Sequence, residues 1–119
     1  SDYLTAGRRH PEYTRPLPEN IRVIEVFAPS VGTKVMKRFD LLNPTSNPYE
    51  IRWTKTDGNS DEGFVCEAPN CLVSSGKRVS MIFSYTPRTV KTVESQWEFA
   101  VPEHSLSVPF LFVGRIMPK

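Results

Sequence analysis

The sequence predicts an all-β, immunoglobulin-like sandwich of two sheets and about seven strands. Three observations support this fold class. The chain has 119 residues, which is the usual size of a single domain. Its 11 prolines are scattered so that few stretches could form a long helix. Between the prolines, apolar residues alternate with a period of two, the pattern of strands with one buried face. A closed barrel is the alternative arrangement of the same strands.

The first twenty residues are expected to form an extended leader outside the sandwich. Residues 1–20 contain Pro11, Pro16 and Pro18 among mixed charges, without a regular apolar period. The sandwich domain is therefore predicted to cover residues 21–117. The chain begins without an initiator Met, which we interpret as the mark of a segment taken from a longer protein.

Seven strands are expected after the leader, each bounded by a turn signal of Pro, Gly, Asn or Ser. They cover residues 21–28, 34–42, 49–54, 64–66, 78–85, 93–101 and 106–116. Trp53 and Phe99 have the apolar parity of their strands, so both are predicted to lie in the core. The last segment has apolar residues on both parities, and Pro109 within it indicates an edge position or a bulge.

Candidate chemical motifs are better explained as turns and surface. Residues 57–63 place oxygen side chains as a calcium loop does, but Glu62 stands where Gly is required and Ala68 where a bidentate Glu is required. We interpret this segment as an exposed hairpin loop. Residues 76–78 lack the further Gly and the Ser or Thr of a phosphate-binding loop, so Gly76 is expected in a turn.

The chain has few histidines and cysteines that could serve in catalysis or metal binding. His10 lies in the leader and His104 in a predicted turn, and neither is near a nucleophile motif. Cys66 and Cys71 are interpreted as a reduced, intracellular pair, because a domain of this size needs no disulfide. An extracellular adhesion domain would instead oxidise them. Zinc would need two more ligands close to this pair. No catalytic residue, cofactor or metal is therefore predicted.

The charge balance and hydropathy restrict the partners. A net charge of +2, with basic and acidic residues interleaved, gives no basic surface for nucleic acid. No apolar run approaches the roughly 18 residues that cross a bilayer, so no membrane insertion is expected. We expect proteins as partners, and no small-molecule substrate.

Several segments together resemble the repeated domains of the Hydin family. They are residues 15–20 (RPLPEN), 26–29 (VFAP), 32–35 (GTKV), 42–45 (LNPT), 76–87, 97–104 and 108–114. The resemblance implies an immunoglobulin-like domain of the ASH type, related to major sperm protein (MSP) and to PapD chaperone domains. It also implies a place in the central pair apparatus of the motile ciliary axoneme, in the cytoplasm, where arrays of such domains support beating.

Four functions follow from these observations. The first is a non-enzymatic structural and interaction module of a tandem array, with neighbouring domains of the parent chain and axonemal or microtubule-associated proteins as partners. The second is an adaptor of the major sperm protein type that binds a peptide at a strand edge or in a groove. An adhesion domain and an enzyme are the remaining alternatives.

The leader carries more apolar side chains than a passive spacer needs. They are Tyr3, Leu4, Tyr13 and Leu17. We expect these residues, Tyr13 and Leu17 above all, to pack against a preceding domain or the near end of this sandwich and so to fix the angle between modules.

Overall fold

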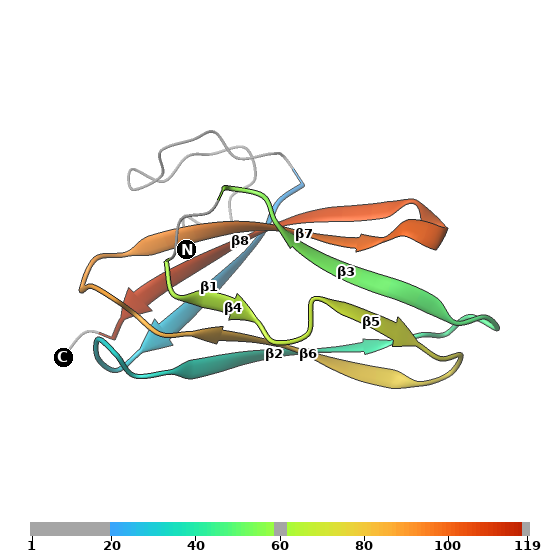
Figure 1. The fold of residues 1–119 in the computed structure, drawn as a ribbon, viewed down its shortest axis with the longest axis horizontal. Coiled ribbons are helices and arrows are strands. Elements are labelled where there is room, and N and C mark those ends of the chain that lie inside the picture. Colours follow the sequence, from blue (N-terminus) through green and yellow to red (C-terminus); the bar gives the residue numbers. More distant parts are fainter. Residues whose placement is uncertain (1–19, 59–61, 118–119) are drawn as a thin grey trace.

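The computed structural model describes residues 20–58 and 62–117, which form two β-sheets and one short 3-10 helix. Eight strands lie in these residues (Figure 1). They are β1 (Arg22–Ala28), β2 (Val35–Leu42), β3 (Tyr49–Lys55), β4 (Phe64–Cys66), β5 (Asn70–Val73), β6 (Arg78–Tyr85), β7 (Val93–Val101) and β8 (Leu106–Ile116), with η2 (Pro102–His104) between the last two. The described part contains no helix long and apolar enough to span a bilayer.

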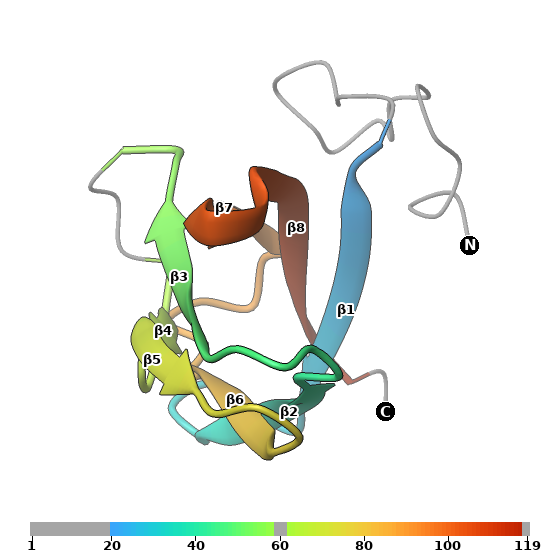
Figure 2. The same ribbon diagram turned by 90° about the vertical axis from the view of Figure 1, so that its right-hand side faces the viewer.

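The strands form two layers, as a sandwich requires (Figure 2). The first sheet has the order β1-β8-β7-β3-β5 and the second has the order β2-β6-β4. The predicted sandwich is confirmed, and the barrel is not formed. The five-stranded sheet joins both ends of the domain, because β1 pairs in parallel with β8 along its whole length (blue and red in Figure 1). All other pairs are antiparallel.

The chain changes sheet at most of its connections. Only β7 and β8 are consecutive strands paired with each other, through η2 and the left-handed Ser105 (φ 51°). The segment at residues 56–63 joins β3 of one sheet to β4 of the other, so its interpretation as a hairpin loop is wrong. β5 was not predicted either, because Val73 is its only fully buried residue and four residues carry too little alternation to signal a strand.

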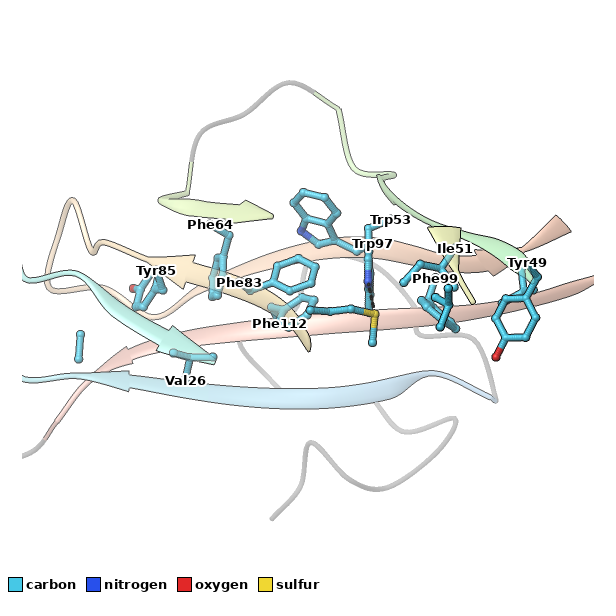
Figure 3. Packing of buried hydrophobic residues seen from close by; sticks show 14 residues of the cluster. Val26, Tyr49, Ile51, Trp53, Phe64, Phe83, Tyr85, Trp97, Phe99 and Phe112 are labelled. Carbon is cyan, nitrogen blue, oxygen red and sulfur yellow. Dashed lines mark hydrogen bonds between the residues drawn. The ribbon is translucent and has the colours of Figure 1, made fainter. Parts of the chain in front are cut away.

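The core between the sheets is built from the alternating faces that the sequence indicates (Figure 3). Trp53 and Phe99 are 4% and 8% exposed, pair in register on β3 and β7, and have ring centroids 5.0 Å apart. Their predicted burial is confirmed. Phe83 of the second sheet meets the Trp53 ring at 4.8 Å and stacks on Phe112 at 4.3 Å. Aromatic pairs at these distances add to the free energy gained by burial.

The pairing of β8 with its two neighbours explains why a proline is tolerated within this strand. The strand is internal in the sheet, between β1 and β7, so an edge position for the whole strand is wrong. However, β1 begins to pair only at Phe110, and Pro109 is paired with Glu98 of β7 alone. The missing N–H of Pro109 therefore costs no bond on the β1 side, which is the local condition for proline in a sheet.

Gly76 has φ +71° and lies in the turn between β5 and β6, as predicted. Its N–H donates to the Asn43 carbonyl at 2.8 Å, which ties this turn to the connection that follows β2. Glycine is required at position 114 for a different reason, because an added Cβ would lie 2.3 Å from the Tyr85 ring. Only glycine allows β8 to approach that ring.

Candidate interaction surfaces

The interaction residues predicted from the sequence, Tyr13 and Leu17, lie outside the described residues, as does His10. The predicted boundary between leader and sandwich at residue 20 also stays a prediction. Within residues 20–58 and 62–117, the candidate interaction surfaces are strand edges, hollows, charged groups and apolar faces.

One side of the sandwich is closed by the chain itself. β4 and β5 are the edge strands there, only three and four residues long. Between them the backbone N–H of Glu67 donates to Ile82 at 2.9 Å, and the carbonyl of Pro69 accepts from Trp53 at 2.8 Å. The crossing segment therefore bonds to both sheets, and little backbone is left for another strand.

The opposite side presents β2, an eight-residue edge strand. Met36 is 60% exposed on its outer face, and Lys34, Lys37 and Arg38 are also exposed. Arg38 lies 3.0 Å from Asp40 on the same face. Lys37 has the parity of the inward-facing residues, and a charge at such a position opposes indiscriminate pairing of strand edges. This edge is long and basic, but the inward-facing charge of Lys37 disfavours non-specific pairing with another strand.

A shallow apolar hollow of about 230 Å³ lies near η2. Its lining residues are Pro44, Thr45, Tyr49, Val101, His104 and Leu106. The His104 ring contacts the Tyr49 ring edge to face, with centroids 5.1 Å apart, which gives this histidine a packing role in the turn where it was predicted. The hollow has room for an apolar side chain.

Two acidic residues of the calcium-like segment, Asp57 and Glu62, bind a lysine. Lys55 Nζ contacts the Asp57 carboxylate and lies 3.0 Å from Glu62 Oε1, while Asp57 also accepts a bond from the Gln96 backbone N–H at 2.8 Å. Burial alone would lower the pKa of Lys55, but the two carboxylates outweigh it and raise that pKa. This network attaches the β3–β4 connection to β7. Within the described residues, no group of three or more His, Cys, Asp or Glu side chains is arranged to hold a metal.

Cys66 and Cys71 are free thiols on β4 and β5, strands of different sheets. Burial raises the pKa of the Cys66 thiol above its ordinary value, so the thiolate is disfavoured there. The arrangement does not activate this sulfur as a nucleophile.

A second apolar cluster lies on the outer face of the five-stranded sheet. We name Ile21, Val23, Leu111 and Val113 the outer cluster. Leu111 and Val113 are both 0% exposed, although they alternate with Phe110 and Phe112, which face the core. The apolar residues on both parities of residues 106–116 were the sequence signal for this cluster, but they did not show which face was covered.

Comparison with known proteins gives two curated relatives and several solved structures. The chain is 37% identical to the hydrocephalus-inducing protein of Mus musculus and 34% identical to its homologue in Homo sapiens, each over 122 aligned residues. Both alignments cover 97% of this chain but only 2% of the relative, so the chain spans a small part of those proteins. No protein-family model matches.

The solved structures show the fold. The ASH/PapD-like domain 7 of human CEP192 matches with a TM-score of 0.63 and 13% identity, over 82% of this chain and 84% of that one. SSP-19, an MSP-domain protein like family member of Caenorhabditis elegans, matches with a TM-score of 0.50 and 9% identity, over 79% and 92%. The Vibrio cholerae VesB protease also matches, with a TM-score of 0.50 and 14% identity, over 79% of this chain and 30% of the protease. At these identities the matches establish a PapD-like and MSP-like sandwich and carry no activity with them.

Proposed function

Because this chain is homologous, over 97% of its length, to a segment of the hydrocephalus-inducing proteins, we propose that it is a structural and protein-interaction module of a ciliary scaffold. In this proposal it is non-enzymatic and one of an array of similar domains in the central pair apparatus of the axoneme, where it supports cilium movement. Its partners are neighbouring domains of the parent protein and axonemal or microtubule-associated proteins. The observation that carries the proposal is the identity of 34–37% along nearly the whole chain.

The structure supports a role in holding proteins together. The domain has a continuous aromatic core, and one of its two sides is closed by backbone bonds. Several of its apolar side chains are exposed, and two of them, Phe27 and Val90, line one hollow. The exposed apolar side chains also include Val31 and Met117. A rigid sandwich with apolar surface at several sites is suited to contacts with neighbouring domains.

Two measurements on motile cilia test this function. In cells whose protein carries Trp53→Ala, which removes a core ring, density at the central pair should be lost in electron tomograms and beating should be impaired. Thr54→Ala, at the neighbouring exposed position of β3, is the matched control and should leave both unchanged. Normal central pairs in the Trp53→Ala cells would contradict the proposal.

Cross-linking of intact axonemes would identify the proteins that lie next to this domain. Lys34, Lys37 and Lys91 are exposed and accessible to amine-reactive cross-linkers. Cross-links from these lysines to central pair proteins are the expected result. Cross-links confined to proteins outside the axoneme would place the domain elsewhere.

A second candidate function is favoured by the β2 edge. An acidic peptide in extended conformation could pair with this edge and neutralise its basic side chains, as in strand addition to other sandwiches. Titration with a short acidic peptide, followed by amide chemical shifts, should then perturb β2 selectively. Lys37→Glu should abolish the effect, and perturbations confined to other strands would exclude this edge.

A further inference from the structure

The outer cluster lies on the face of the five-stranded sheet that points away from the core. The second sheet covers the opposite face (Figure 2). Leu111 and Val113 are nevertheless fully shielded, and the described hydrophobic residues that pack against them, Ile21 and Val23, are only partly buried. An open sheet face normally carries polar residues. The apolar composition here indicates that this face binds another segment.

The register shows how the face is laid out. Leu111 lies between Val23 of β1 and Gln96 of β7. Val113 lies between Glu25 and Glu94 in the next row. Towards the start of β8, Pro109 is paired with Glu98 of β7. An apolar strip thus follows β8 from Pro109 to Val113 and β1 as far as Val23, where Glu25 follows on β1, and a row of Glu, Gln and Glu runs beside the strip along β7.

We propose that residues 1–19 of this same chain cover this face, with Leu17 and Tyr13 on the outer cluster. Leu17 is four residues before Ile21, so its backbone can reach about 14 Å from that residue, and Tyr13 can reach about 28 Å. The strip from Pro109 to Val113 is about 14 Å long. Both side chains can therefore reach Leu111 and Val113.

The chemistry of the segment matches the two halves of the face. Its apolar side chains fit the strip, and its adjacent Arg8 and Arg9 complement Glu94 and Glu98 on β7. The segment is also joined to the outer cluster through Ile21, which belongs to it. A tethered partner has a high effective concentration, so this contact is favoured over a separate molecule.

This inference concerns the isolated chain and does not depend on the ciliary role. Its consequence for a longer protein is that the chain would enter the domain along the outer sheet face, at a fixed direction. Tyr13 and Leu17 would then control the position of whatever precedes them by holding the leader to its own sandwich.

The direct test uses the 119-residue chain without substitution. Isotope-filtered NMR on a mixture of labelled and unlabelled chains separates contacts within a molecule from contacts between molecules. We expect intramolecular nuclear Overhauser effects from the Tyr13 ring and the Leu17 methyl groups to the methyl groups of Leu111 and Val113. Their absence in a folded protein overturns the proposal, and intermolecular effects would show that a second copy is the occupant.

Substitutions supply the second test. Tyr13→Ser with Leu17→Ser should shift the Leu111 and Val113 methyl resonances and increase the fluorescence of a bound hydrophobic dye several-fold, while core resonances stay in place. Leu72→Ser, at an exposed position on β5 of the same sheet, is the matched control and should change neither. Unchanged methyl resonances in the Tyr13 and Leu17 variant would also refute the inference.

Discussion

Asn43 offers the sharpest test of how the loops of this sandwich are held. The residue follows β2 and is 0% exposed. Its side-chain amide donates to the carbonyls of Asn47 and Val73, each at 2.9 Å. Its side-chain oxygen accepts from the backbone N–H of Thr45 at 2.9 Å and from the Thr45 hydroxyl at 2.6 Å. All of the hydrogen-bonding capacity of this buried side chain is used.

Replacing Asn43 by Ala removes these four bonds at once. The Val73 carbonyl is in a buried residue and would lose its partner, at a cost of about 1–3 kcal/mol. The Thr45 N–H is only partly buried, so water can replace part of its lost bond, and its loss adds about 0.5–1.5 kcal/mol. The Asn47 carbonyl keeps a bond from the Thr45 hydroxyl. Asn43→Ala should therefore lower the free energy of unfolding by about 2–4 kcal/mol.

Thermal and urea unfolding followed by circular dichroism measure this loss. For a domain of this size the melting temperature should fall by roughly 10–20 °C. Asn47→Ala is the matched control, because it makes the same substitution four residues later, at an exposed side chain, and should stay within about 0.5 kcal/mol of the unsubstituted protein. A loss below about 1 kcal/mol for Asn43→Ala, or an equal loss for both variants, would refute the assignment of Asn43 as the centre of these connections.

Three further predictions concern the core and the thiols. Trp53→Ala and Phe99→Ala should each cost about 3–5 kcal/mol, seen as a large fall in melting temperature, and unchanged melting for both would mean that the strand faces are inverted. Gly114→Ala should cost about 1–3 kcal/mol in urea unfolding, because its Cβ would lie 2.3 Å from the tyrosine ring that ends β6; a stability equal to the unsubstituted protein would show that this ring moves freely. Free-thiol titration of the native protein should find two thiols, with slow alkylation of Cys66 because burial raises its pKa; a protected pair with Cys71, whose reduction lowers the melting temperature, would support the adhesion alternative.

The strands with a strong alternating pattern could be read directly from the sequence. In β6 and β7 every second residue is apolar or small, and the structure buries that face with Met81, Phe83, Trp97 and Phe99. The alternation is local, since it depends only on which side of a pleated strand each side chain takes. The resemblance of several segments to the Hydin family could be recognised for the same reason, because it depends on residues and their spacing.

The polar partners of the core needed the structure. Trp53 was expected inside and the structure also buries Trp97, and the indole N–H group of each requires an acceptor once buried. Trp53 Nε1 donates to the sulfur of Met81 across the sandwich at 3.2 Å, and Trp97 Nε1 donates to Ser95 on its own strand at 2.9 Å. The second contact follows from alternation, but the first depends on how the two sheets are placed against each other.

The order of the strands also depended on tertiary structure. A polar loop such as residues 56–63 has the same composition whether the chain returns to the same sheet or crosses to the other, which is why the hairpin prediction failed there. Pro109 indicated an edge, yet the strand is internal; the proline is tolerated there because β1 begins to pair with β8 only at Phe110, one residue after it. Sequence alone therefore determined the fold class, most strands and their buried faces. Which strands pair, and why Leu111 and Val113 are buried on the outer face, was decided by contacts between residues far apart in the chain, and no local pattern encodes those contacts.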